Sequence, residues 1–358
     1  MNPSITQKER IISLDIIRGF ALFGILLINV GAFKILTEGM QIPDYTGMNE
    51  VIAKLIEIFV EKKFFSIFSF LFGAGFFIFS SRAESRGDKP RWRFARRLLA
   101  LFLIGIIHLI FFWGSILATY AIIGFLMIPF YRAKVSTISK WLCGIIIVYI
   151  IMLLMGIFSL DLGILSKVSS FLGNDAVAIF IMFLTGFLAA KANWIRRISE
   201  LSTRIKWIQI ITLPIVIGFS LWIWFTPDRD YQYLQTIIGL GQIPTTYLYL
   251  STLFLILENK HIEKLLQPIA CVGQMAFTNY WAQSFIGLAI ISLMGLEFVS
   301  PINKVFISII IFVIQIIYSV IWFKFFKMGP LEKVWRYMTY GRRTVSNKNI
   351  DIIRDKAV

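Results

Sequence analysis

The chain has 358 residues, of which 58% are hydrophobic and only 16% are charged, and its net charge is +16. Soluble globular domains carry about a quarter charged residues, so this composition excludes an ordinary soluble domain, and a mean hydropathy of +0.77 indicates a polytopic membrane protein. Because the basic residues lie between apolar runs, as membrane proteins place them, the positive charge does not predict nucleic acid as a partner.

About ten apolar segments predict transmembrane helices, in an all-α polytopic architecture that forms one integral membrane domain. A segment before the second span, NEVIAKLIEIFVEKK, has apolar residues at helical spacing with charges between them. It predicts an interfacial helix within 45–63. The first span is long and is not followed by a small-residue cleavage site, so we expect no removable signal peptide. The predicted spans are 13–35, 64–81, 94–113, 115–131, 138–160, 175–191, 206–225, 235–257, 268–294 and 302–326.

Lysine and arginine are distributed unequally over alternate connections between these spans. Of the 36 lysine and arginine residues, 28 lie in the N-terminus, in the connections after even-numbered spans and in the tail from Lys324. Seven lie in the other connections. Because basic residues stay on the cytoplasmic side, we expect the protein in a bacterial cytoplasmic membrane. Both termini, including the segment 327–358, are then on the cytoplasmic side of that membrane. The basic segments there are suited to contact anionic lipid headgroups.

The first span carries three polar residues on one helical face. Asp15, Arg18 and Asn29 are linked by steps of three and four residues. Asp15 and Arg18 lie one turn apart, so we expect them to pair and to neutralise each other near the cytoplasmic surface. Alternatively, Arg18 binds an anionic ligand such as a phosphate, because its planar guanidinium fits oxyanions. Asn29 lies about 21 Å beyond Asp15, near the outer surface.

The third span contains the only histidine predicted inside the membrane, His108, about six residues from its outer end. The fourth span runs back inward and places Thr119 and Tyr120 level with His108, while Asn29 falls at a similar depth. Histidine can act as a general base near neutral pH, and neighbouring hydroxyl groups can orient it. Alternatively, His108 is a neutral packing residue that forms a hydrogen bond between helices.

Spans eight and nine are rich in amide and hydroxyl side chains. Asn279 and Gln283 are four residues apart and share a helical face, with Tyr280 nearby. Interhelical hydrogen bonding explains any one of these residues, but their density predicts a polar cavity. The two cysteines, Cys143 and Cys271, lie in separate apolar runs and are expected to be packing residues. The chain has neither a glycine-rich phosphate loop nor a zinc-binding His-Glu-x-x-His motif, so no metal cofactor is expected.

Five segments together resemble the YeiB-type family of bacterial membrane proteins, which is catalogued as a domain of unknown function. In chain order they are RIISLDIIRGFALFGILLIN, FFSIFSFLFGAGF, RRLLALFLIGIIHLIFFWGSILATYAIIG, VGQMAFTNYWAQS and GPLEKVWR. That family is in turn similar to transmembrane acyltransferases such as the heparan-alpha-glucosaminide N-acetyltransferases. Those enzymes take an acyl group from cytoplasmic acyl-coenzyme A and deliver it to an acceptor at the opposite face.

The first span carries the more detailed part of this resemblance. Arg10, Asp15, Arg18-Gly19 and Asn29 match the pattern of the acetyltransferases, which implies that Asn29 belongs to a catalytic site. The acetyltransferases have their catalytic histidine in the loop that follows this asparagine, whereas this chain has VGAFKILTEGMQIPDYTG there, without a histidine. We therefore expect His108 to take that place from the neighbouring helix.

These observations leave two main functions open. In the first, the protein is a membrane acyltransferase with acyl-coenzyme A as co-substrate and a small molecule, lipid or glycan as acceptor. In the second, it is a transporter or a lipid-handling protein without chemistry, because charged and amide side chains inside a membrane also line substrate paths. A scaffold for another membrane protein is a third possibility, and a homo-oligomer is compatible with each. The expected site comprises catalytic His108, Asn29 and Tyr120, cofactor-binding Arg18, Arg96 and Arg97, and substrate-binding Asn279, Gln283, Tyr280 and Thr119.

Overall fold

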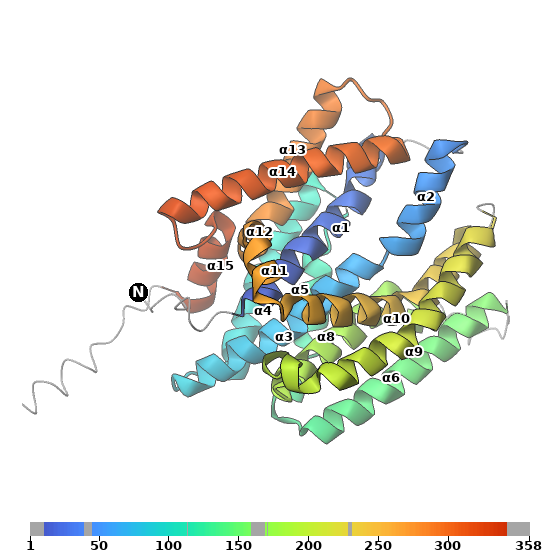
Figure 1. Ribbon diagram of the computed structural model, residues 1–358. Helices are drawn as coiled ribbons and strands as arrows, with labels where there is room; N and C mark the ends of the chain where they lie inside the picture. Colours follow the sequence, from blue (N-terminus) through green and yellow to red (C-terminus); the bar gives the residue numbers. More distant parts are fainter. Residues whose placement is uncertain are drawn as a thin grey trace, which may run out of the picture.

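The computed structural model describes residues 11–38, 45–112, 114–158, 169, 171–227 and 231–341, and in these ranges it contains helices and turns but no strand. The protein is an all-α polytopic membrane protein. Seven helices of the described chain are long and apolar enough to cross a membrane. The first of them, α1, lies inside the bundle and packs against α3, α12, α13 and α14 (Figure 1).

The helices of the described ranges are joined mostly by short connections, two of which contain 3₁₀ turns at Ile128–Arg132 and Trp194–Arg196. Their bounds are α1 Ile12–Glu38, α2 Met48–Phe59, α3 Lys63–Ser85, α4 Pro90–Phe111, α5 Leu117–Phe125, α6 Val135–Ile157, α8 Asp175–Lys191, α9 Ile198–Phe225, α10 Tyr231–Leu257, α11 Lys260–Leu265, α12 Gln267–Gln274, α13 Ala276–Leu293, α14 Pro301–Phe325 and α15 Pro330–Tyr340.

Three of the ten predicted spans are not among these seven helices. The span predicted at 115–131 is the nine-residue α5 followed by a 3₁₀ turn, because Pro129 has no N–H with which to continue an α-helix. The span predicted at 268–294 is interrupted at Met275, between α12 and α13. Helix α8 has the predicted bounds, but its 17 residues rise only about 25 Å, slightly less than a hydrocarbon core of about 30 Å.

The two segments predicted outside the spans are both partly helical. Within 45–63 the chain forms α2, which buries Lys54 and Ile58 and exposes apolar side chains such as Met48 and Leu55. It is separated from α3 by a turn at residues 60–62, in which Lys62 has a positive φ of 64°. Within 327–358 the chain forms α15, which turns back against α4 and α13, while residues 342–358 lie outside the described residues.

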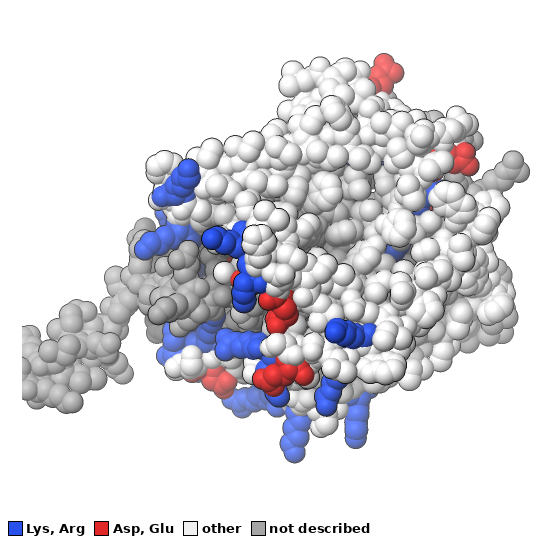
Figure 2. Space-filling model, viewed as in Figure 1, with Lys and Arg blue, Asp and Glu red and all other residues white. Residues whose placement is uncertain are grey.

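Basic side chains gather at one end of the bundle. Figure 2 shows Lys and Arg concentrated where α3 ends and where α6 and α9 begin, while most of the remaining face is neither basic nor acidic. We call this the basic end; it includes residues 82–97, 132–134, 191–206 and 324–336. The asymmetry predicted from the sequence is therefore an asymmetry of the folded molecule.

Two glycines bring α3 and α8 into backbone contact. A Cβ built on Gly73 would lie 1.9 Å from the carbonyl oxygen of Phe183, and one on Gly186 would lie 1.8 Å from that of Phe70. Small residues allow this approach, as at many membrane helix interfaces. Beside this contact, Phe72 and Phe76 of α3 stack on Phe183 and Phe187 of α8.

We predict that Gly186→Ala lowers the midpoint of thermal unfolding by several degrees, because the new methyl group forces two backbones apart, and overpacking of this kind costs about 1–3 kcal/mol or more. Gly218→Ala is the matched control, since nothing lies within 4 Å of a Cβ at that position of α9. Heating detergent-solubilised protein and measuring the fraction that remains monodisperse gives both midpoints. Equal midpoints for the two variants would contradict the close contact.

Candidate functional site

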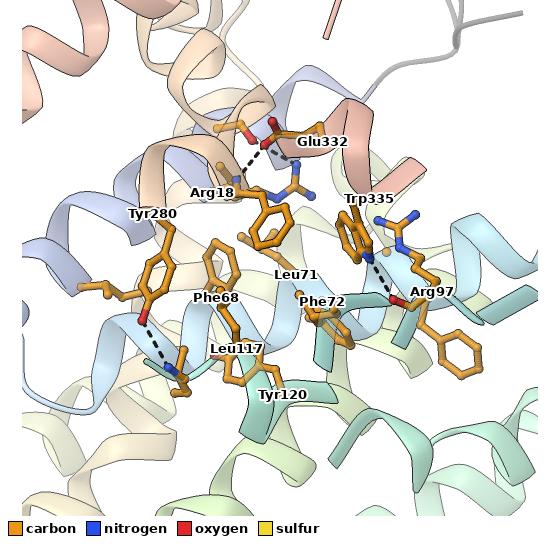
Figure 3. Close-up of a pocket in the computed structure, with 18 of the residues that line it drawn as sticks. Arg18, Phe68, Leu71, Phe72, Arg97, Leu117, Tyr120, Tyr280, Glu332 and Trp335 are labelled. Atoms are coloured by element: carbon orange, nitrogen blue, oxygen red, sulfur yellow. Dashed lines mark hydrogen bonds between the residues drawn. The ribbon is translucent and has the colours of Figure 1, made fainter. Parts of the chain in front are cut away.

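A cavity of about 220 Å³ lies between α1, α3, α4, α5, α12, α13 and α15. We call it the inner cavity. Its walls are mainly aromatic and aliphatic side chains, among them Phe68 and Phe72 of α3. In Figure 3, these apolar side chains lie between two polar ends. One end carries Arg18, Arg97, Glu332 and Trp335, and the other carries Tyr120 and Tyr280.

A second cavity, of about 300 Å³, continues the first toward the basic end of the bundle. We call it the vestibule. The two share Arg97, Glu332 and Trp335 among their lining residues. The vestibule adds four basic residues, Arg82, Arg86, Lys327 and Arg336. Along α3, the combined space extends from Phe68 to Arg82, a rise of about 21 Å. An elongated ligand with an anionic end and an apolar end therefore matches the shape and the charge of this space.

Arg97 stands at the junction of the two cavities. Its guanidinium lies 3.9 Å from the ring centroid of Trp335 and 4.6 Å from that of Phe79. The indole of Trp335 also donates a 2.8 Å hydrogen bond to the backbone oxygen of Arg97. In the described part of the chain, no carboxylate forms an ion pair with Arg97. Its charge is therefore held by aromatic rings alone.

Arg18 is compensated in a different way. Its Nη1 lies 2.8 Å from Oδ1 of Asp15, in the ion pair that their one-turn spacing predicts, and 3.5 Å from the carbonyl oxygen of Gly273. About a quarter of its side chain is exposed, and it lines the inner cavity. Arg18 can therefore meet a ligand while it remains bonded to Asp15.

Among the described residues, Glu332 is the one carboxylate that lines either cavity, and its oxygens accept hydrogen bonds from other groups of the protein. The interruption at Met275 leaves the first N–H groups of α13 without helical partners. The carboxylate of Glu332 accepts hydrogen bonds from the N–H groups of Phe277, at 2.8 Å, and Thr278, at 3.2 Å, and from the Thr278 hydroxyl, at 2.5 Å. It therefore caps α13 with both of its oxygens.

At its inner end, the cavity is connected to His108 by a chain of polar groups. The Tyr280 hydroxyl accepts a 3.2 Å hydrogen bond from the N–H of Ile116, and the side chains of Ser115 and Asn29 are its polar neighbours. Ser115 Oγ lies 2.8 Å from His108 Nδ1. Ser115 and Tyr280 therefore lie between the histidine and the cavity.

His108 itself does not line the cavity. It is completely buried, its ring is stacked on Trp281 at a centroid distance of 4.7 Å, and its Nε2 lies 3.4 Å from Ser284 Oγ. Tyr280, which does line the cavity, is 5.4 Å from it, centroid to centroid. Contact between the histidine and a ligand would therefore be indirect, and Asn29 likewise does not line the cavity.

Tyr120 and Thr119 lie on different faces of α5. Tyr120 lines the inner cavity, and its hydroxyl donates a 2.7 Å hydrogen bond to the carbonyl oxygen of Phe65 and lies 2.7 Å from Ser69 Oγ. Thr119 is exposed on the outside of the bundle. Consecutive helical residues point about 100° apart, so the two hydroxyls predicted to act together are not brought to one site.

Three other residues proposed from the sequence lie away from the cavity. Asn279 is completely buried, and its amide donates to Val272 O at 2.9 Å and to Ser319 Oγ at 3.2 Å, so it ties α13 to α12 and α14. Gln283 is also completely buried, and its amide has no hydrogen-bond partner in the described part of the chain. Arg96 donates a 3.2 Å hydrogen bond to Met338 O and so attaches α4 to α15.

Sequence reasoning missed Glu332, Trp335 and Ser115. The available signal was the grouping of the five family-like segments, since each of them contributes to the inner cavity. Within the described residues, no group of three His, Cys, Asp or Glu side chains is placed to hold a metal ion. The five contributions include Arg18, Phe68, Tyr120, Tyr280 and Trp335, in chain order.

Comparison with known proteins gives one family and several relatives of full length. Residues 189–342 match the family model described as "Protein of unknown function (DUF418)". An uncharacterized 39.9 kDa protein in the amylase 3' region of Bacillus acidopullulyticus is 32% identical over 96% of this chain and 97% of its own length. YxaH of Bacillus subtilis is 27% identical over 95% and 96%, and YeiB of Escherichia coli is 25% identical over 92% and 96%. No solved structure matches.

We predict that Glu332→Gln destabilises the protein by about 1–2 kcal/mol, because the neutral amide offers one acceptor oxygen instead of two and loses the attraction to the helix N-terminus. Glu200→Gln is the control, since the pair of Glu200 with Arg197 is exposed on both sides and contributes little. Thermal unfolding of both variants in detergent measures the difference. Unchanged stability of Glu332→Gln would show that the cap is dispensable.

Proposed function

We propose that this chain, which belongs to the DUF418 family of proteins of unknown function, is a membrane acyltransferase that takes its acyl group from acyl-coenzyme A. The proposal rests mainly on Arg97, for which the described part of the chain offers no carboxylate partner, at the point where a basic vestibule meets an aromatic cavity. A partly buried charge without a partner is costly, and the phosphates of a ligand would compensate it.

Acyl-coenzyme A has the required division of charge and shape. Its phosphates are placed in the vestibule, near Arg82, Arg86 and Arg97, and its narrow arm extends along the phenylalanines of α3 toward the inner end. The acyl thioester would then lie beside Tyr280. Basic residues mark the cytoplasmic side of membrane proteins, so we place the basic end in the cytoplasm of a bacterial cell and the acceptor nearer the opposite face.

The proposed chemistry uses Tyr280 as the group that contacts the reactants. The oxygen or nitrogen of the acceptor attacks the thioester carbonyl carbon; the new bond to carbon forms as the carbon–sulfur bond breaks. The proton of the acceptor passes to Tyr280 and on through Ser115 to His108, and the leaving thiolate takes up a proton as free coenzyme A. Asn29 acts as a positioning residue for the Tyr280 hydroxyl.

A second candidate function is carriage of an amphiphilic anion without chemistry. One observation favours it: His108, the only histidine near the cavity among the described residues, is completely buried and does not line it. A carrier would bind the same ligand in the same cavity. It would differ from a transferase in releasing no free coenzyme A.

We predict that acetyl-coenzyme A binds the purified protein saturably and that Arg97→Gln weakens this binding at least tenfold, as expected for the loss of a charged partner of a phosphate. Arg18→Ala should weaken it less, because Arg18 is already paired with Asp15. Arg91→Gln removes a charge from the exposed first turn of the same helix and should leave the affinity unchanged. Titration calorimetry measures all three. Absence of binding to well-folded protein, or equal losses for Arg91 and Arg97 variants, would refute this placement of the ligand.

We predict that membranes containing the protein release free coenzyme A from acetyl-coenzyme A, and that Tyr280→Phe and Ser115→Ala each lower the rate about 100-fold or more, because both interrupt the path of the proton. Tyr233→Phe, a phenol lost from α10 far from the cavity, is the control. Chromatographic detection of coenzyme A and of transferred radioactive acetyl groups measures the rate. Binding without release by the unaltered protein would favour the carrier, and full activity of Tyr280→Phe would remove this mechanism.

A further inference from the structure

A third cavity, of about 590 Å³, lies among α3, α6, α8, α9 and α10 and shares no lining residue with the inner cavity or the vestibule. Its volume falls in the range of small-molecule sites, about 300–1,000 Å³. The two helices beside it, α6 and α9, are the least buried of the candidate membrane spans, together with α14. Their exposed side chains are mostly apolar. We call this cavity the lateral groove, because it lies among helices that face the hydrocarbon of the membrane.

The lateral groove occupies one half of the membrane thickness. Its lining residues on α9 run from Ile198 to Ile208, a rise of about 15 Å, against a hydrocarbon core of about 30 Å. On α6 it uses only the first third of the helix, up to Cys143, and on α8 only the last half, from Thr185. All these portions lie toward the basic end. The groove is therefore as deep as one leaflet, on the side where the basic residues gather.

The chemistry of the lateral groove changes along its length. Away from the basic end, the hydroxyl groups of Thr185 and Tyr247 form a 3.1 Å hydrogen bond with each other. The Thr185 hydroxyl also donates a hydrogen bond to the carbonyl oxygen of Ile181. The remaining lining of the groove is mostly aliphatic and aromatic. Toward the basic end lies Arg204, which is the only ionised residue among the described residues that line the groove. The neighbouring Glu200 is paired with Arg197 at 2.7 Å.

From this arrangement we propose that the lateral groove binds one anionic phospholipid of the leaflet at the basic end. An acyl chain lies along α9 among the apolar side chains, and the lipid phosphate lies at Arg204. Three features of the groove select this occupant. The groove is as deep as one leaflet, its lining is apolar where the lipid acyl chain lies, and it has a single cation where the lipid headgroup lies. A neutral lipid would fill the apolar part but would leave Arg204 without a counter-ion. This lipid site is separate from the proposed acyl-transfer site, because the lateral groove shares no lining residue with the inner cavity or the vestibule.

The test compares binding of phosphatidylglycerol and phosphatidylcholine to the delipidated full-length protein in detergent, by native mass spectrometry. We expect one phosphatidylglycerol to bind more tightly than phosphatidylcholine, and Arg204→Gln to reduce that preference about fivefold. Lys206→Gln is the matched control. It removes the same charge two residues away on the same helix, from a side chain outside the groove, and should keep the preference.

A second measurement locates the lipid on the unaltered protein. Phosphatidylglycerol that carries a photoreactive diazirine in its acyl chain should cross-link to α6 and α9 peptides that contain groove residues such as Cys143 and Ile205. Cross-links spread evenly over the bundle would overturn the proposal. Equal affinity for the two lipids, or equal effects of the Arg204 and Lys206 substitutions, would overturn it as well. So would a loss of cross-linking in the groove as the protein concentration rises, because this would indicate that a second copy of the chain covers the groove.

Discussion

A helix that begins inside a membrane has backbone N–H groups that neither water nor lipid can satisfy, so some other part of the protein has to accept their hydrogen bonds. At the start of α13 this acceptor is the carboxylate of Glu332, which comes from α15. The rest of the site depends on this cap. It holds α15 across α13, and it thereby brings Trp335 over Arg97 at the mouth of the inner cavity.

The two arginines at that mouth show two ways of holding a charge at membrane depth. Arg18 is bonded to Asp15 one turn away and makes a local pair that needs no other element. Arg97 instead lies between the rings of Trp335 and Phe79, which stabilise a cation without neutralising it. The difference matters for binding, because only the second arrangement leaves a full charge for an anionic ligand. From this point Phe72 and Phe68 of α3 line the cavity toward Tyr280, so its lining changes from polar to apolar along its length.

The sequence was sufficient for the architecture because apolar runs and basic connections are local properties. The bounds of α8 agree with the predicted span, and Asp15 pairs with Arg18 as their spacing indicates. The break at Met275 was not predictable in this way, because it is stabilised by a residue 55 positions from Phe277 along the chain. Local periodicity also cannot decide which of two adjacent residues faces a cavity. Arg97 and Tyr120 line it, whereas Arg96 and Thr119, one position earlier in each case, do not.

The position of α15 in the chain has a consequence for how the protein is made. Every other wall of the inner cavity comes from helices that leave the ribosome earlier, and Arg18 is in the first of them. Chains insert and fold from their N-terminal parts onward during synthesis. The carboxylate of Glu332 therefore reaches the start of α13 only when nearly the whole bundle is in the membrane. The same holds for the indole of Trp335, which covers Arg97. Assembly of the inner cavity is thus a late step of biogenesis, and an incomplete chain cannot hold the ligand in the way proposed here.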